Sequence, residues 1–358
     1  MQPSTKNPSP LTPDSSLKRW LITGGCGFIG TSLIAKLQQE GGHQIRVIDN
    51  LSTGTREDLA MVCEFEELDP NSSLLTPNAS LNKTPNSSLF TPDSPVQLVT
   101  GDILDEALAL NITQDVDIIV HLAANTGVGP SVEDPRSDCY ANVIGTFNYL
   151  EAARKNKVDR FVFASSGAPA GEVEPPIHEE LPPHPVSPYG ASKLAGEGYC
   201  SAYSKSFGID TVALRFGNVY GPGSVHKNSV VAKFIRRALN GEVLEIFGDG
   251  SQTRDFIYID DLIEAAMLAA TVKDIGGETF QIATSRETTV GEMAEQLVGV
   301  MESRGVSNIK VVNAETRVGD VKRNYSDTTK ARARLGWQPN TELKDGLIKT
   351  VDYFLGDK

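Results

Sequence analysis

The chain alternates between short apolar runs and longer segments with the apolar period of a helix. The first run, Trp20–Ile22, leads into a glycine cluster and then a helical period that extends to about Glu40. A second run covers residues 44–48, and the alternation continues from Val96 to Leu214. Apolar strands with helices between them are typical of a doubly wound parallel sheet. We expect strands near 96–100, 116–122, 161–164 and 211–214, and helices near 103–110, 140–155 and 188–207.

The pattern is less regular after Gly217. Helical periods occur at residues 230–239, 262–270, 290–300 and 343–355, with short glycine-rich segments among them. We expect a smaller C-terminal α/β lobe that lies over the crevice at the carboxyl ends of the strands. The predicted fold class is therefore α/β, a Rossmann-type sheet with an additional lobe.

Two segments interrupt this pattern. Residues 1–18 and about 64–95 are rich in Pro, Ser, Thr and Asn, and cannot bury enough surface to repay the entropy of ordering. We expect a disordered tail and a low-complexity insertion in a surface loop. The N-terminus lacks the apolar region and cleavage site of a secretion signal, so we attribute the glycosylation-like triplets of the insertion to its composition. These triplets begin at Asn71, Asn78, Asn82 and Asn86.

Charge and cysteine use narrow the partners. The chain has 46 acidic and 33 basic residues and a formal net charge of -13. This balance disfavours nucleic acid or an anionic membrane, so a phosphate would have to meet local arginines or backbone amides. The four cysteines lack metal-ligand spacing, and no apolar run reaches the ~18 residues that a membrane span needs. We expect a cytoplasmic protein without a metal site.

The glycine cluster after the first strand predicts a dinucleotide site. Gly24 permits the turn, Gly27 lets the backbone approach a diphosphate, and Gly30 lets the helix pack against the strand. The next strand ends in Asp49, whose carboxylate can accept a hydrogen bond from a ribose 2′-hydroxyl and would repel a 2′-phosphate. This combination favours NAD over NADP. We accordingly divide the chain into an NAD-binding Rossmann domain at 19–216 and a mainly substrate-binding lobe at 217–358, from which some segments return to the first domain.

Tyr189 and Lys193 stand four residues apart at the expected start of a helix, so both face the same side. The positive charge of a neighbouring lysine makes a phenolate less costly, which lets a tyrosine act as a base. Ser166 follows a strand and should line the same crevice. Arg254 and Arg317 are candidates for a second diphosphate, since a guanidinium binds phosphate oxygens in pairs; surface ion pairs with Asp255 or Asp320 are the alternative.

Together these motifs resemble the extended short-chain dehydrogenase/reductase family, specifically its NAD-dependent nucleotide-sugar epimerases and dehydratases. The resemblance covers about Trp20 to Leu355 apart from the insertion. It rests on Thr23-Gly24-Gly25-x-Gly27-Phe28-Ile29-Gly30, Asp49-Asn50-Leu51, Gly101-Asp102, His121-Leu122-Ala123-Ala124, Ser165-Ser166, Tyr189-x-x-x-Lys193, Arg215-Phe216-x-Asn218-Val219-Tyr220-Gly221-Pro222 and Gly248-Asp249-Gly250-x-Gln252-x-Arg254-Asp255.

The resemblance also implies roles for individual residues. Ser166, Tyr189 and Lys193 would be catalytic, and His121 would be structural. The implied cofactor-binding residues are Gly24, Gly27, Phe28, Ile29, Gly30, Asp49, Asn50, Asp102, Ile103, Leu122, Ala123, Ala124, Asn142, Tyr189, Lys193 and Phe216. The implied substrate-binding residues are Thr126, Ser166, Asn218, Phe247, Arg254 and Arg317.

The implied reaction is a 4-epimerisation. Tyr189, its pKa lowered by Lys193 and the cationic nicotinamide, would take the proton of the sugar 4-hydroxyl while a hydride leaves C4 for NAD. Ser166 would hydrogen-bond the same oxygen. The 4-keto sugar would then turn and take the hydride back on its other face, so that NAD is regenerated in each cycle.

Departures from the family pattern separate its members. The 4,6-dehydratases carry Asp and Glu after the catalytic hydroxyl, where this chain has Gly167 and Ala168, and the uronate decarboxylases carry a nearby glutamate. Neither Gly167 nor Ala168 has a titratable group, which argues against dehydration and decarboxylation. Epimerases commonly continue with Val-Tyr-Gly, whereas this chain has Pro169-Ala170-Gly171, so the loop beside the sugar is unusual.

The leading hypothesis is a 4-epimerase of a UDP-hexose, UDP-N-acetylhexosamine or UDP-hexuronate. One alternative is a nucleotide-sugar reductase or dehydrogenase with exchangeable NAD(H), and another is a non-catalytic NAD-binding regulator. The family usually dimerises through the Tyr/Lys helix and the long helix before it, so we also predict a homodimer. The small and apolar positions that would permit close approach are Ala191, Leu194, Ala195, Gly198 and Tyr203.

Overall fold

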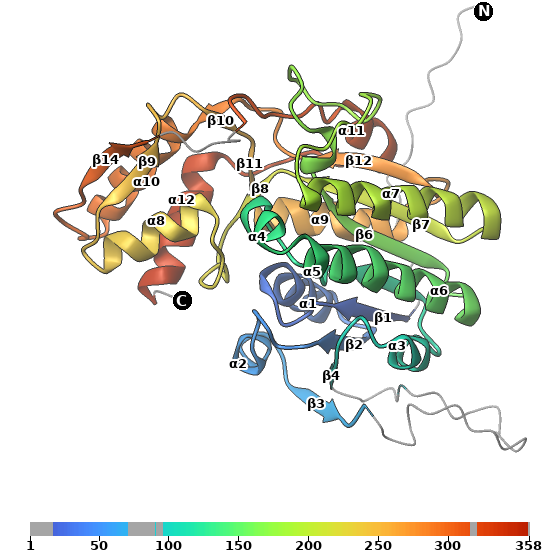
Figure 1. The fold of residues 1–358 in the computed structure, drawn as a ribbon. Coiled ribbons are helices and arrows are strands. Elements are labelled where there is room, and N and C mark those ends of the chain that lie inside the picture. The colour runs from blue at the N-terminus through green and yellow to red at the C-terminus, as the bar shows by residue number, and fades with distance from the viewer. Residues whose placement is uncertain (1–16, 71–89, 91–95, 316–320, 357–358) are drawn as a thin grey trace, which may run out of the picture.

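A parallel sheet of eight strands forms the centre of the molecule (Figure 1). The computed structural model describes residues 17–70, 90, 96–315 and 321–356. The strand order is β12-β7-β6-β5-β1-β2-β4-β3, so strands are added first on one side of β1 and then on the other. Such sheets bind ligands at this switch point, beyond the carboxyl ends of their strands. The predicted fold class is confirmed. The strands are β1 Lys18–Thr23, β2 His43–Asp49, β3 Phe65–Leu68, β4 Val96–Thr100, β5 Ile118–His121, β6 Arg160–Ser166, β7 Asp210–Phe216 and β12 Glu278–Ile282.

Helices cover both faces of this sheet. One face carries α3 Glu106–Ile112, α6 Thr146–Asn156 and α7 Pro188–Phe207, and the other carries α1 Phe28–Glu40, α9 Ile259–Thr271 and α11 Thr329–Leu335. Both faces are therefore withdrawn from water, which explains why the strands read as continuous apolar runs. The shorter helices around them are α2 Arg56–Ala60, α4 Val128–Glu133, α5 Pro135–Cys139 and a π-helix at Tyr140–Gly145.

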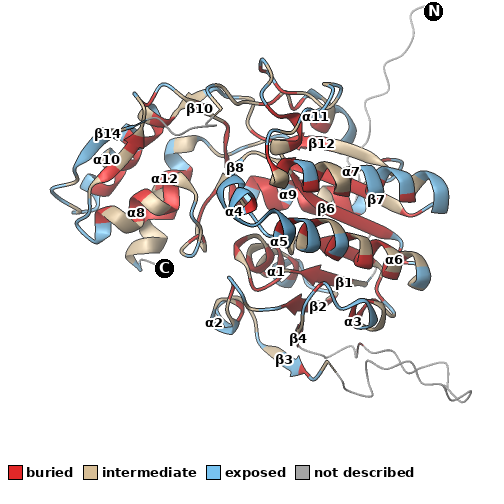
Figure 2. Ribbon diagram, in the orientation of Figure 1, coloured by how far each residue is buried: buried red, intermediate tan, exposed pale blue. Residues whose placement is uncertain are grey.

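The core consists of two hydrophobic clusters, one on each face of the sheet. Leu21 of β1 belongs to the cluster under α3, α6 and α7, whereas Trp20 and Ile22 belong to the cluster under α1 and α9. Successive side chains of a strand point to opposite faces, which produces this division. The second cluster continues into the C-terminal lobe through Phe234 and Leu347. Figure 2 shows the strands buried and the outer sides of α6 and α7 exposed.

The C-terminal lobe is built on three helices and small two-stranded sheets. β8 pairs with β11, β9 with β14 and β10 with β13. The lobe is joined to the main sheet because β12, which lies between segments of the lobe in sequence, pairs with β7. The predicted domain limits stay predictions. The elements are α8 Val230–Leu239, α10 Val290–Ser303, α12 Leu343–Leu355, β8 Asn218–Tyr220, β9 Leu244–Phe247, β10 Thr253–Arg254, β11 Phe256–Tyr258, β13 Thr288–Thr289 and β14 Val311–Ala314.

The start of the predicted insertion differs from the expectation. β3, at residues 65–68, pairs in parallel with β4 and forms the edge of the sheet. Phe90 is also buried, with the guanidinium carbon of Arg46 4.3 Å from its ring centroid. Both ends of the predicted loop thus contact the folded core. The tail to residue 16 and residues 71–89 and 91–95, which include the four Asn-x-Ser/Thr triplets, lie outside the described residues.

Candidate active site

The glycine turn connects β1 to α1. Gly24 has a φ of 69°, and a Cβ there would lie 2.8 Å from the backbone nitrogen of Ala123. A Cβ on Gly30 would lie 2.5 Å from the carbonyl oxygen of Gly24, so both positions need glycine for a close backbone approach. Gly27 precedes α1 and no side chain caps that helix, which leaves its first amides available to an anion. This turn fits the diphosphate of a dinucleotide.

Asp49 ends β2 beside the glycine turn and is buried. Its Oδ2 accepts a hydrogen bond from the backbone nitrogen of Cys26 at 3.0 Å, and its Oδ1 accepts one from Leu51 at 2.8 Å. Burial raises the pKa of Asp49, and the two backbone donors oppose that rise. At the neighbouring strand, Asn50 Nδ2 lies 3.4 Å from Asp102 Oδ2. The predicted adenosine-binding residues therefore meet at the carboxyl ends of β2 and β4.

His121 ends β5 and is part of a buried hydrogen-bond chain. Thr23 Oγ1 accepts from the backbone nitrogens of Leu122 and Ala123, both at 3.1 Å, so its own proton goes to His121 Nδ1 at 2.9 Å. His121 Nε2 then donates to Thr146 Oγ1 at 3.1 Å. Burial lowers the pKa of His121 to about 3, and the positive charge of Lys193 adds to this effect. The imidazole is neutral at ordinary pH and holds the strand ends in place.

Asn142 lies in the π-helix and anchors the loop that follows β5. Its side-chain oxygen accepts from the backbone nitrogen of Asn125 at 2.8 Å. Its Nδ2 lies 2.9 Å from both Asn125 O and Asp138 Oδ1, and 3.2 Å from Ser192 Oγ. Asn142 therefore joins the loop at residues 122–126 to α7 through Asn125 and Ser192. A contact between Asn142 and the cofactor stays a prediction.

Tyr189 and Lys193 lie in the first turns of α7. Ser187 caps this helix, accepting a hydrogen bond from the backbone nitrogen of Gly190 at 3.1 Å. Lys193 is buried, and its Nζ donates to the carbonyl oxygen of Ala164 at 2.8 Å and lies 5.9 Å from the ring centroid of Tyr189. Burial lowers the pKa of Lys193 to about 8, and the charge of Asp138 opposes that shift.

The pKa of Tyr189 is raised in the protein chain alone. Burial raises the pKa of its phenol, a hydrogen bond with Ser166 works in the opposite direction, and the negative charge of Asp138 raises the pKa further. Desolvation of the phenolate is the largest of these influences and Lys193 is not among them, so the lowering expected from Lys193 together with the cationic nicotinamide stays a prediction. Ser166, at the end of β6, also accepts a hydrogen bond from the backbone nitrogen of Ala168 at 3.1 Å. The predicted catalytic residues are thus brought together beyond the carboxyl end of β6.

A buried ion pair, which was not predicted from the sequence, links α7 to strand β7 of the sheet. Glu197 lies one turn after Lys193 and binds Arg215 of β7 through two hydrogen bonds, at 2.8 and 2.7 Å. Ser165 Oγ donates to the same carboxylate at 2.5 Å. Ser165 directly precedes Ser166, so this network ties together the strand and the helix that carry the predicted catalytic groups. The helical spacing of Glu197 from Lys193 is the signal that could have located it.

Apart from Ser166 at the end of β6, the predicted substrate residues belong to the C-terminal lobe or to the loop before α4. Asn218 is in β8, where its backbone nitrogen donates to Asp255 O at 2.7 Å, and Phe247 ends β9. Arg254 Nη1 donates to the carbonyl oxygens of Thr253 and Val321, at 2.6 and 2.7 Å. Thr126 is exposed. Arg317 and Asp320 lie outside the described residues, and the substrate roles of all these residues stay predictions.

Asp255 takes a structural part in the lobe. Its Oδ1 accepts from the backbone nitrogen of Thr284 at 2.7 Å, and its Oδ2 from those of Ser285 and Ser326 at 3.0 and 3.2 Å. Burial raises its pKa, against the effect of these donors. Asp255 thus joins three segments of the lobe next to Arg254.

Within the described residues, no group of His, Cys, Asp and Glu could hold a metal ion, and no helix is long and apolar enough to cross a membrane.

Comparisons with known proteins identify a matching family and several relatives of this chain. Residues 20–283 match the model of the NAD dependent epimerase/dehydratase family. A putative UDP-glucose 4-epimerase of Methanocaldococcus jannaschii is 36% identical over 93% of this chain and 97% of its own. The crystal structure of UDP-glucose 4-epimerase from Thermotoga maritima, with UDP-glucose, has a TM-score of 0.79 and 34% identity over 94% of this chain and 99% of its own. The UDP-N-acetylglucosamine 4-epimerase of Methanobrevibacter ruminantium, in complex with UDP-N-acetylmuramic acid, has a TM-score of 0.80 and 30% identity over 96% of this chain and 100% of its own.

Proposed function

This chain belongs to the NAD-dependent epimerase/dehydratase family, and we propose that it is a nucleotide-sugar 4-epimerase, an isomerase that uses NAD. Its substrate would be a UDP-hexose, UDP-N-acetylhexosamine or UDP-hexuronate. One observation carries the proposal. Ser166, Tyr189 and Lys193 lie together beyond the carboxyl end of β6, while Gly167 and Ala168, which follow Ser166, have no acidic or basic side chain. Oxidation and reduction at one carbon need only the first three groups.

The residues at the carboxyl edge of the sheet fit NAD. The uncapped start of α1 and its glycine turn would hold the diphosphate, and Asp49 would accept from the adenosine ribose. Lys193 would donate to the nicotinamide ribose. NAD, when bound, supplies a hydride acceptor beside C4 of the sugar and a positive charge next to Tyr189.

Tyr189 is the proposed acid and base. It would take the proton of the sugar 4-hydroxyl and return a proton to the same oxygen after the sugar has turned. Ser166, whose interaction with Tyr189 works against the rise in the pKa of the phenol, would hold that oxygen during both steps. Because burial raises the pKa of Tyr189 in the protein chain alone, the phenolate needs further positive charge nearby. Lys193 supplies part of that charge, since its pKa of about 8 leaves the ammonium protonated at neutral pH.

The loop after Ser166 limits the chemistry further. Elimination of water from a 4-keto sugar needs an acid and a base close to C5 and C6. Residues 168–170 instead form a short 3-10 turn of alanine and proline. Glu174 lies further along this loop. Its carboxylate forms an ion pair with exposed Arg323 of the lobe, not with a group near Tyr189. This arrangement supports an epimerase over a dehydratase.

The decisive experiment is incubation of the purified protein and NAD with UDP-glucose, UDP-N-acetylglucosamine and UDP-glucuronate, with chromatographic separation of the 4-epimers. We expect one of them to be converted to an equilibrium mixture. Tyr189→Phe should lower the rate by about 10²- to 10⁴-fold, the usual contribution of a general acid or base. Tyr199→Phe, at an exposed position of the same helix, is the matched control and should keep the rate.

The same incubations separate the alternatives. Net formation or loss of NADH, followed by absorbance near 340 nm in step with product, would favour a reductase or dehydrogenase with exchangeable cofactor. A protein that converts no nucleotide sugar, and in which Tyr189→Phe leaves every other measurable property unchanged, would favour the NAD-binding regulator.

We also propose a homodimer formed through α7 and the helical segment at residues 135–156. Tyr140, Ile144 and Phe207 are 48%, 41% and 53% exposed on this side of the sheet. Exposed apolar side chains grouped on helices are typical of a surface that binds another protein. Ala191 and Gly198 are also exposed on α7, whereas Tyr203 is buried and donates to Glu151 within its own chain. Light scattering should give twice the 38.5 kDa of the chain, and a monomer mass would refute the proposal.

A cytoplasmic location completes the proposed function. All four cysteines are free, as expected in a compartment that keeps thiols reduced. Fractionation of cells that produce the protein should recover it with cytoplasmic markers.

A further inference from the structure

The loop at residues 221–229 leaves the lobe and lies against the start of α1. A Cβ on Gly223 would lie 3.5 Å from the ring of Phe28, which is the first residue of α1. His226 Nε2 lies 3.7 Å from Asp58 Oδ1 in α2. This loop therefore bridges the C-terminal lobe and the two helices that follow β1 and β2.

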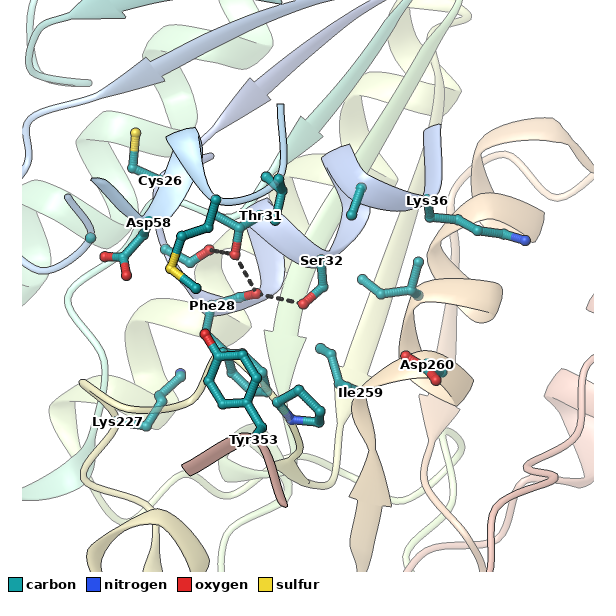
Figure 3. A pocket seen from close by; sticks show the side chains of 18 of the residues that line it. Cys26, Phe28, Thr31, Ser32, Lys36, Asp58, Lys227, Ile259, Asp260 and Tyr353 are labelled. Atoms are coloured by element: carbon teal, nitrogen blue, oxygen red, sulfur yellow. Dashed lines mark hydrogen bonds between the residues drawn. The ribbon is translucent and has the colours of Figure 1, made fainter. Parts of the chain in front are cut away.

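A cavity of about 620 Å³ opens beneath this loop. Gly27, Phe28 and Thr31 line it from the start of α1, Lys227 from the loop, and Tyr353 from α12. Figure 3 shows Phe28, Thr31 and Tyr353 around this space, with Lys227 beside it. The cavity thus reaches the uncapped end of α1, where the glycine turn would receive a diphosphate. None of Asn218, Phe247 and Arg254, the predicted substrate residues, lines it.

Lys227 places a positive charge at this cavity, which three carboxylates, Asp58, Asp260 and Glu264, also line. Within the part of the chain that the structure describes, its ammonium group has no hydrogen bond and no ion pair. Burial lowers its pKa, and no carboxylate counteracts that effect. Its charge also acts on Lys193, whose pKa it lowers. A desolvated ammonium that lies near another one is unfavourable unless an anion joins them.

We propose that Lys227 binds the diphosphate of the dinucleotide cofactor, opposite the start of α1; this inference rests on the proposed function. The cofactor diphosphate is favoured over that of the substrate because Gly27 and Phe28 line the same cavity. Lys227 belongs to the loop that joins the lobe, so it would link the cofactor to the lobe as well as to the sheet. An epimerase regenerates its cofactor in each cycle, and this link would slow the cofactor's release.

The test measures binding of ADP-ribose, NAD, adenosine and UDP to the cofactor-free protein by calorimetry. We expect Lys227→Met to weaken ADP-ribose and NAD by about 10- to 100-fold, as for a lost hydrogen bond between charged groups. Adenosine, which lacks the diphosphate, should bind unchanged, and Lys227→Arg should restore most of the affinity. Lys36→Met is the matched control, because Lys36 lines the same cavity but lies 3.3 Å from Glu40 Oε1.

Each outcome decides between the two proposals. Equal binding of ADP-ribose by the wild type and Lys227→Met overturns the role of Lys227 and leaves the proposed function intact. A loss of UDP binding with unchanged ADP-ribose binding assigns Lys227 to the substrate diphosphate and also overturns the inference. A wild-type protein that binds neither NAD nor ADP-ribose contradicts both this inference and the proposed function.

Discussion

Replacing Glu197 with glutamine should destabilise the protein strongly, because it breaks the buried ion pair with Arg215 that lies next to the proposed catalytic residues. The side chains of Glu197 and Arg215 are only 7% and 5% exposed, so neither charge has much contact with water. Glutamine has nearly the same volume but replaces one carboxylate oxygen with an amide that donates hydrogen bonds. That amide would face donors from Arg215 or Ser165, and the guanidinium would lose its negative partner.

The expected cost follows from this geometry. Removing one partner of a buried ion pair typically costs about 3–5 kcal/mol, since the other charge is left without compensation. Both Glu197 oxygens bind Arg215 at 2.8 Å or less, and Oε1 also accepts from Ser165, so we expect a value within this range. The double variant Glu197→Met with Arg215→Met removes both charges and fills similar volume. The free energy of unfolding of this double variant should lie within about 2 kcal/mol of the wild-type value. The unpaired Ser165 hydroxyl should account for about 1 kcal/mol of the difference.

Urea unfolding of the cofactor-free protein at pH 7, monitored by the fluorescence of Trp20 and Trp337, measures the loss of stability in Glu197→Gln and in the double variant. The single variants Glu197→Met and Arg215→Met complete the double-mutant cycle and isolate the coupling between the two charges. A loss below about 1 kcal/mol for Glu197→Gln would refute the reasoning. So would a double variant as unstable as Glu197→Met.

Three further predictions concern the cofactor side of the site. Since burial lowers the pKa of His121 from its usual 6.5 to about 3, its contribution to stability is complete above pH 6.5 and falls by up to about 1.4 kcal/mol per pH unit as the pH drops toward 3. His121→Asn should lose less stability than the wild type between pH 7.5 and 4.5 in urea titrations, and equal losses would assign the acid sensitivity to other groups. Asp49→Asn should weaken NAD binding by about tenfold and narrow the preference over NADP, because it removes the charge that repels a 2′-phosphate; calorimetry with both cofactors would contradict this if the preference stayed the same. Gly30→Ala should lower the free energy of unfolding by about 1–3 kcal/mol and impair NAD binding, because its Cβ would lie 2.5 Å from Gly24 O; wild-type values in thermal unfolding and calorimetry would contradict it.

Local patterns in the sequence were sufficient for most of the elements. The helix expected at residues 188–207 has these limits in the structure, because Ser187 caps its start and Gly208 follows its end in a left-handed conformation. The glycine turn was predicted for the same kind of reason, since the close approaches at Gly24 and Gly30 are made within a short stretch of chain. β3 was missed because Phe65-Glu66-Glu67-Leu68 is a short edge strand with a polar centre, next to a low-complexity segment.

The chemistry of the site depended on contacts between distant segments. The spacing of Tyr189 and Lys193 indicated that they share a helix face, but burial by the surrounding chain determines the direction in which each pKa moves. The pairing of Glu197 with Arg215, and the shared cavity that Lys227 lines together with the first residues of α1, likewise require the folded chain. Period and capping depend on neighbours in sequence, whereas desolvation and ion pairing depend on which remote segments exclude water. The sequence alone therefore determined the sheet and the glycine turn and proposed the catalytic groups, whereas the tertiary structure decided the burial of those groups and the contacts that support them.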